Sequence, residues 1–146
     1  MPSKRSSARQ LAAAQHEFLV DRSLGRIALV TNLRSAGLVV RTLADVYGEE
    51  PAQETQDTEW IRLAAQEDWI VLCKDDRIRR RPAERDALIE GKVRVFCLTN
   101  ANLGFAEQAV YFMANRHRII QAARKPGPYL YGVYKDTVKR LWPPEA

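Results

Sequence analysis

The sequence predicts an α/β fold: a parallel sheet of about four to five strands with helices on both faces and a β-ribbon at the C-terminus. Apolar strand-like runs alternate along the chain with segments of helical periodicity, an order typical of parallel α/β sheets. The run WIVLC is continuously apolar, as expected for a strand covered on both sides. The chain has 146 residues, 46% of them hydrophobic, which suits one packed domain. We expect that domain at 17–146, after a basic extension at 1–16.

In the first half of the domain, the first strand is expected at EFLV, residues 17–20. Residues 25–36 have a helical pattern, with apolar positions three residues apart and a glycine at the expected C-terminal stop. LVVRTL, residues 38–43, is the second expected strand. The polar stretch 44–56 contains a proline and is predicted to be a loop.

In the second half, DTEWIRLAAQE (57–67) is predicted to be a helix, because Trp60, Ile61 and Ala64 share one face. The buried strand WIVLC follows at 69–73. A short helix is expected at 82–90, with a proline in its first turn, and another strand at VRVFCL, 93–98.

One long helix is predicted from Gly104 to about Arg124. The residues expected to face inward there are Leu103, Ala106, Val110, Met113 and Ile120. The closing segment PYLYGVYKDTVKRLW is expected to form a β-ribbon that turns near Lys135 and Asp136.

The charge balance is basic: 23 Lys and Arg against 18 Asp and Glu give a formal net charge of +5. This allows a polyanionic partner without requiring one. Cys73 and Cys97 each lie in an apolar strand-like run and are expected to be core thiols rather than a disulfide or metal ligands. Because the N-terminus lacks the apolar core of a signal peptide and no segment reaches membrane-spanning length, we expect a cytoplasmic protein.

Two apolar runs end on aspartate. Asp21 follows the first strand, Asp75 follows WIVLC, and Asp57 begins the helix between them. Since ligands of open α/β sheets bind at the carboxyl ends of the strands, these carboxylates could meet and hold Mg²⁺ or Mn²⁺. Each acid also has a structural interpretation. Asp21 and Asp57 could be helix N-caps, and Asp75 could begin a turn beside a solvated Asp76.

A basic run follows the third acid. Its members, which could pair with RNA phosphates near a metal-bound phosphodiester, are Lys74, Arg77, Arg79, Arg80 and Arg81. The alternative is a solvated basic turn whose arginines pair with Glu84 and Asp86. The residues alone do not decide between the two.

The segments FLVDRSLG, DTEW and WIVLCKDDRIRRRPAE together resemble the PIN-like nucleases, most closely a branch of VapC-type toxins of bacterial toxin–antitoxin pairs. The resemblance covers roughly residues 17–128. It implies a small parallel sheet with an acidic Mg²⁺ or Mn²⁺ pocket that cleaves RNA, a cognate antitoxin that holds the protein inactive, and commonly a dimer.

Position by position, the resemblance assigns the metal-binding and catalytic acids to Asp21, Asp57 and Asp75. Cys73 stands where threonine is commoner. The fourth acid usually lies two or three residues past the third, where this chain has an arginine and an isoleucine, so that Asp76 is the candidate substitute. The other residues expected at the pocket are Arg22, Ser23 and Asn102.

The leading hypothesis is therefore a metal-dependent endoribonuclease in which water attacks phosphorus in line. The alternative is a catalytically impaired module that binds RNA or an antitoxin, suggested by the missing fourth acid and the arginine cluster. Metal-dependent phosphotransfer signalling is a third reading, which the lack of an isolated central aspartate with a later strand-end lysine disfavours. The RNA target is not set by these residues.

Overall fold

The structure is a computed structural model that describes residues 16–24, 27–100 and 102–144. Apart from its last residue, the predicted extension at 1–16 lies outside the described residues. The strands are β1 (Glu17–Val20), β2 (Val39–Thr42), β3 (Ile70–Cys73), β4 (Arg94–Leu98), β5 (Tyr129–Val133) and β6 (Val138–Trp142). The helices are α2 (Ala28–Ser35), α3 (Leu43–Tyr47), α4 (Glu49–Glu54), α5 (Asp57–Glu67), the short 3₁₀ helix η1 (Asp76–Arg79), α6 (Pro82–Gly91), α7 (Phe105–Ala114) and α8 (Arg116–Ala123).

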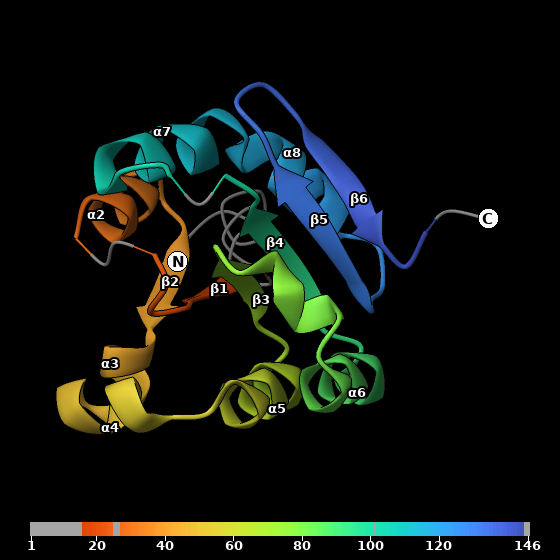
Figure 1. The fold of residues 1–146 in the computed structure, drawn as a ribbon. Coiled ribbons are helices and arrows are strands. Elements are labelled where there is room, and N and C mark those ends of the chain that lie inside the picture. Colours follow the sequence, from red (N-terminus) through yellow and green to blue (C-terminus); the bar gives the residue numbers. More distant parts are fainter. Residues whose placement is uncertain (1–15, 25–26, 101, 145–146) are drawn as a thin grey trace, which may run out of the picture.

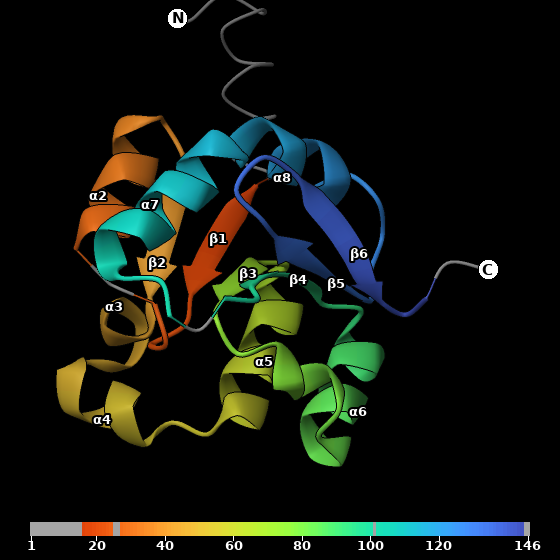
Figure 2. The same ribbon diagram turned by 45° about the horizontal axis from the view of Figure 1, so that its top comes forward.

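The described strands form one sheet in the order β2-β1-β3-β4-β5-β6 (Figures 1 and 2). Every neighbouring pair is parallel except β5 and β6, which are antiparallel. The predicted α/β class, parallel sheet and C-terminal ribbon are therefore confirmed. The ribbon is not separate from the sheet, because β5 pairs in parallel with β4 and so extends it.

Helices cover both faces of the sheet, with α2, α7 and α8 on one side and α3 to α6 on the other (Figure 1). Side chains alternate between these faces along each strand. In β3, Ile70 and Leu72 pack into the core beneath α2, α7 and α8, whereas Val71 and Cys73 pack into the core beneath α5 and α6. All residues of β3 are buried, as the continuous apolar run predicts.

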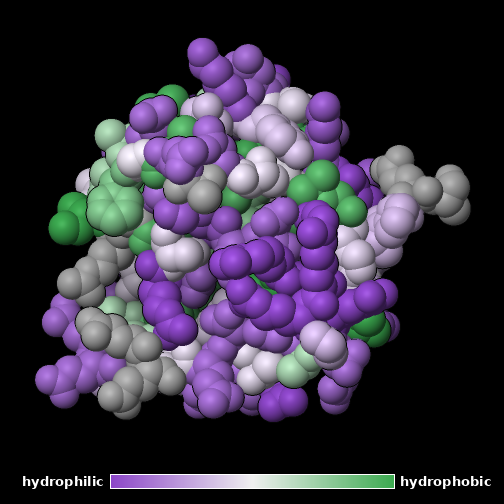
Figure 3. Space-filling model, viewed as in Figure 1, coloured by the Kyte–Doolittle hydropathy of each residue, from purple (hydrophilic) through white to green (hydrophobic). Residues whose placement is uncertain are grey.

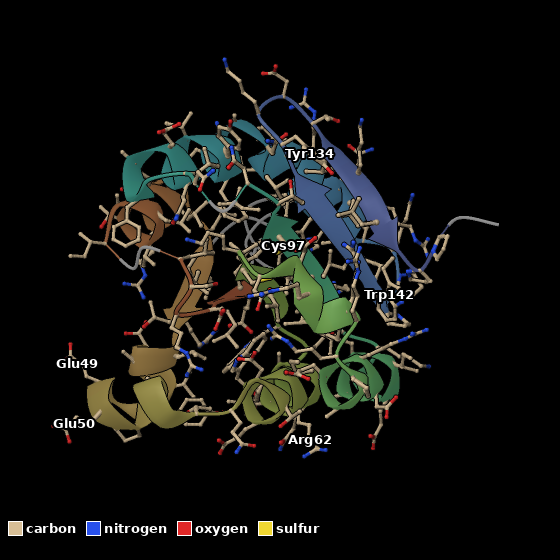
Figure 4. All side chains as sticks on the ribbon, in the orientation of Figure 1. Glu49, Glu50, Arg62, Cys97, Tyr134 and Trp142 are labelled. Carbon is tan, nitrogen blue, oxygen red and sulfur yellow. The ribbon has the colours of Figure 1, made fainter. Side chains whose placement is uncertain are left out.

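The two thiols are neighbours within this core. Cys73 and Cys97 face each other across β3 and β4, and both are free and buried. The expectation of core thiols is thus correct. Figure 4 shows Cys97 in the middle of the molecule, within the sheet.

The prediction of a loop at 44–56 is wrong, because this stretch forms α3 and α4. Thr42 and Asp45 form a reciprocal capping box that starts α3. Gly48 then breaks the chain direction at φ +88°, a backbone conformation that glycine adopts without strain. Pro51 lies in the first turn of α4, where its missing N–H removes no helical hydrogen bond.

The prediction of one long helix at 104–124 is also wrong. The segment breaks at Asn115, whose side-chain amide donates to the carbonyls of Tyr111 (2.9 Å) and Tyr134 (2.7 Å). The buried face of α7 is formed by Ala109 and Phe112, with Gln108 also buried. The predicted inward residues Ala106 and Val110 are instead exposed.

Polar and apolar side chains are segregated on the face shown in Figure 3. Strongly hydrophilic side chains gather in front of η1, and apolar ones gather at the side where α2 and α7 lie. Ile27, Phe105 and Val110 are the large apolar residues exposed there, at 76%, 64% and 60%. Ile27 lies before α2 at the N-cap position. None of the helices in the described ranges is long and apolar enough to cross a membrane.

Candidate active site

Asp21 lies directly after β1 at the carboxyl edge of the sheet, and only 6% of its surface is exposed. Its backbone N–H donates to the carbonyl of Leu72 (2.9 Å), which continues the β1–β3 ladder by one residue. The hydroxyl of Ser23 donates to Asp21 Oδ2 (2.7 Å) and accepts from the N–H of Lys74 (3.1 Å). The turn after β1 and the end of β3 are therefore tied together by Ser23.

The second carboxylate oxygen of Asp21 is a buried acceptor without a hydrogen-bond partner among the described residues. Burial raises the pKa of Asp21, and the nearby charge of Asp57 raises it further, against hydrogen bonds from Ser23 that lower it. Leaving an acceptor unpaired in the interior is unfavourable unless a ligand or ion completes its environment. Asp21 is not a helix cap, because Ile27 occupies the N-cap position of the next helix, α2.

Asp57 is the first residue of α5, and the indole N–H of Trp60 donates to its Oδ1 (2.9 Å). Trp60 itself is 1% exposed, so the core fixes the donor. Two arginines approach the same carboxylate: Arg22 Nη2 lies 4.0 Å from Oδ1, and Arg81 Nη1 lies 3.6 Å from Oδ2. Asp57 makes no side-chain cap at this helix, and Gln56 occupies the N-cap position.

Asp75 follows β3 and precedes η1. Its Oδ1 accepts from the backbone N–H (3.1 Å) and from Nε (2.9 Å) of Arg77, and its Oδ2 accepts from Arg81 Nη2 (2.8 Å). Partial burial raises the pKa of Asp75, but the hydrogen bonds from these arginines outweigh it and hold the pKa below its usual range. The expectation that Asp75 begins a turn is correct, and the same side chain also faces Asp57 across Arg81.

The guanidinium of Arg81 lies between two of the predicted acids. It contacts Asp75 at 2.8 Å, Asp57 at 3.6 Å and, one helical turn along the chain, Glu84 at 3.7 Å. Repulsion between carboxylates at one sheet edge requires positive charge among them. In this structure a side chain of the protein supplies that charge.

The remaining predicted site residues are placed differently. Asp76 forms an ion pair with Arg79 (3.4 Å), whereas Asp57 and Asp75 pair with Arg81. The side chain of Arg77 is 72% exposed, and Arg80 is exposed beside it. Asn102 is also exposed, in the turn after β4, where its N–H donates to Asn100 Oδ1 (3.0 Å).

Arg22 holds the neighbouring wall of the site. Its Nη1 donates to the carbonyls of Ala52 (3.1 Å) and Thr55 (2.8 Å), at the end of α4. The same guanidinium reaches Asp57. Arg22 therefore joins α4 to the acidic edge, a role that the sequence position after Asp21 does not reveal.

The donor chemistry fits Mg²⁺ or Mn²⁺, since Asp21, Asp57 and Asp75 offer only carboxylate oxygens and one of these oxygens is buried without a partner. Within the described residues, however, no three His, Cys, Asp or Glu side chains are grouped closely enough to hold a metal ion. Asp57 and Asp75 are instead paired with Arg81. A complete metal site would require Arg81 to move away from these two carboxylates.

Similarity to known proteins identifies the family of this chain. Residues 16–100 match the sequence profile of a family described as a PIN like domain. The chain belongs to the PIN-like domain family. It is also 36% identical over 133 residues to a Mycobacterium tuberculosis protein named "Putative ribonuclease VapC45", an alignment that spans 91% of this chain and 96% of the relative. No solved structure matches.

The family match has a definite extent on this PIN-like chain. It begins just before β1 and ends after β4, so it contains all three acids and the whole basic run. The alignment with the VapC45 relative covers most of the chain. The predicted resemblance to PIN-like domains and to the VapC-type branch is thereby confirmed.

Two features of the site escaped prediction from the sequence. Trp60 was expected only as a core residue, but its indole N–H also fixes Asp57. Arg81 was expected either to contact phosphate or to pair with Glu84; it pairs with Glu84, and it also bridges Asp57 and Asp75. The spacing of Arg81 and Glu84, three residues apart at the start of α6, is the one sequence signal for an arginine held in place by its own helix.

Proposed function

We propose that this protein is a metal-dependent endoribonuclease that acts as the toxin of a toxin–antitoxin pair. One observation carries the proposal: Asp21 and Asp75 follow neighbouring parallel strands at the carboxyl edge of the sheet, and Asp57 at the start of α5 shares Arg81 with Asp75. Membership of the PIN-like family and the ribonuclease name of the relative support the reaction class.

In this proposal Asp21, Asp57 and Asp75 hold Mg²⁺ or Mn²⁺, which when bound activates the nucleophile and stabilises charge on the phosphodiester. Ser23 keeps Asp21 oriented through its hydrogen bond, and Trp60 does the same for Asp57. Asp76 would serve as a fourth ligand only after leaving Arg79.

The basic run would bind the RNA backbone. Arg77 and Arg80 are exposed next to Asp75, where phosphates flanking the cleaved bond would lie. Arg81 would exchange its carboxylate partners for a phosphate when a cation binds, because its planar guanidinium suits both. Lys74 and Arg79 are only partly exposed and would contribute mainly charge.

Two carboxylate-to-amide variants test the site. Asp21→Asn and Asp75→Asn should each lose Mn²⁺ binding in calorimetry and lose cleavage of structured RNA, with circular dichroism unchanged. Asp86→Asn, on the exposed surface of α6, is the matched control and should behave as wild type. Wild-type turnover in either site variant would show that the acids are wrongly assigned.

A second function is favoured by the arginine pairs, which already neutralise Asp57, Asp75 and Asp76. It is that of an RNA- or antitoxin-binding module without catalysis. It predicts RNA affinity that falls with salt and does not respond to chelator, with no cleavage. Metal-dependent cleavage by wild type would exclude it.

We also propose a cognate antitoxin and a homodimer as partners. The exposed apolar residues Ile27, Phe105 and Val110 offer a surface for such contacts. Sedimentation of the purified chain tests the dimer. Coexpression with the protein encoded beside it, followed by the RNA cleavage assay, tests the antitoxin: cleavage should be suppressed in the complex and recovered when that protein is removed.

A further inference from the structure

A cavity of about 320 Å³ opens beside Asp21. It lies where the carboxyl ends of β1 and β2 meet α3 and α4, and its lining includes neither Asp57 nor Asp75. Its apolar lining is formed by Val20, Leu24, Leu43, Ala44 and Ala52. The cavity therefore adjoins the acidic edge and shares one acid with it.

The walls of the cavity are fixed by hydrogen bonds. The capping box of Thr42 and Asp45 sets the start of α3, and Arg34 adds a contact to Asp45 (3.0 Å). On the other side, Arg22 holds the end of α4 through two carbonyls. A hollow held open by such contacts is preformed, which lowers the cost of filling it.

The size, apolar lining and charge of the cavity together limit which ligand it can bind. The volume is at the small end of the range for small-molecule pockets. The charged lining residues are the acids Asp21 and Glu49 and the base Arg22, so the net charge is negative, which disfavours a phosphate, and the aliphatic lining disfavours a bare sugar. Figure 4 shows Glu49 on the outer part of α4, so its charge belongs to the rim. A flat, uncharged, partly apolar group whose edge carries N–H donors satisfies both conditions.

We propose that this cavity receives the base of the nucleotide next to the cleaved phosphate, with a preference for bases that present an amino group. The proposal rests on the proposed function, because it is RNA at the acidic edge that brings a base within reach. Bases splayed out of single-stranded RNA are the usual targets of sequence-specific protein contacts. Adenine, cytosine and guanine can each donate an amino N–H to a carboxylate, whereas uracil has no amino group.

Nucleoside binding to the metal-free protein tests the cavity independently of cleavage. Adenosine, followed by methyl NMR, should shift the resonances of Leu24 and Leu43, and uridine or ribose 5-phosphate should shift them much less. Ala44→Leu fills the cavity and should weaken adenosine binding by at least about tenfold. The same change at exposed Ala106 is the matched control and should leave binding unchanged.

Equal adenosine shifts in wild type and Ala44→Leu, or no shift at these methyl groups, would overturn the cavity assignment. Cleavage of RNA then separates the two proposals. If wild type cleaves, an abasic nucleotide beside the cleaved bond should slow wild type but not Ala44→Leu. If adenosine binds as expected and no RNA is cleaved under any metal condition, the base site is supported and the nuclease assignment fails.

Discussion

Removing the guanidinium of Arg81 should destabilise the protein in a way that a divalent cation reverses. Arg81 makes a charge-assisted hydrogen bond of 2.8 Å to Asp75 and weaker ion contacts to Asp57 and Glu84. Such a hydrogen bond contributes roughly 1.5–3 kcal/mol when shielded, and exposed ion pairs roughly 0.2–1 kcal/mol. Because the Arg81 side chain is 37% exposed, we expect Arg81→Gln to lower the free energy of unfolding by about 1–2 kcal/mol in chelator.

The assay is urea unfolding of wild type and Arg81→Gln, each with chelator and with increasing Mn²⁺. A ligand that binds only the native state raises the unfolding free energy in proportion to the logarithm of one plus the ratio of its free concentration to its Kd. Mn²⁺ should therefore stabilise Arg81→Gln more than wild type, because in wild type the cation must first displace the guanidinium. Arg80→Gln, which removes an exposed arginine of the same run, is the control. Equal stabilisation of wild type and Arg81→Gln by Mn²⁺ would show that the cation and the Arg81 guanidinium do not compete for the same position beside Asp57 and Asp75.

Three further predictions concern stability. Asp21→Asn should stabilise the protein at neutral pH, because the raised pKa of Asp21 gives stability that is lost as pH rises through that pKa. Asp75→Asn should destabilise it, because the lowered pKa of Asp75 gives stability that is lost as pH falls through that pKa. In urea unfolding from acid to neutral pH, the difference in unfolding free energy between variant and wild type should therefore change with pH in opposite directions for the two variants. Gly91→Val should cost about 1–3 kcal/mol, because a Cβ there would clash with the Cβ of Ala65, and Ala65→Gly should recover part of that loss in thermal unfolding. Asn115→Ala should cost about 1–3 kcal/mol, since the Tyr134 carbonyl loses its side-chain donor and the Tyr111 carbonyl keeps only the backbone N–H of residue 115; an unchanged melting temperature would contradict the role given to this break between α7 and α8.

Much of the fold follows from local pattern. The continuous apolar run at β3 and the placement of Asp21 directly after β1 depend only on neighbouring residues, and both predictions agree with the structure; Asp75 follows β3 after one intervening residue, Lys74. The break at Asn115 depends on a carbonyl from the β5–β6 turn, far along the chain, so helical periodicity could not reveal it. The exposure of Val110 follows from the same break, because α7 packs on α2 with a different face.

The site divides in the same way. That the acids share one edge follows from strand order, which a βαβ pattern constrains. Where the arginines point depends on η1, a single turn that brings Arg81 back over the end of β3. A run of five basic residues shows that positive charge is near, but the side chain that bridges Asp57 and Asp75 is selected by tertiary geometry.

The paired thiols of Cys73 and Cys97 at the centre of the sheet can report how often the sheet opens at β3 and β4. Hydrogen bonding with Cys97 and complete burial raise the pKa of the Cys73 thiol well above its usual value, so an alkylating reagent finds almost no thiolate in the native state. Labelling must then wait for β3 and β4 to become exposed, and its rate measures how often β3, the strand that precedes Asp75, opens. Since both cysteines are internal to the sheet, the unmodified sequence already carries this probe.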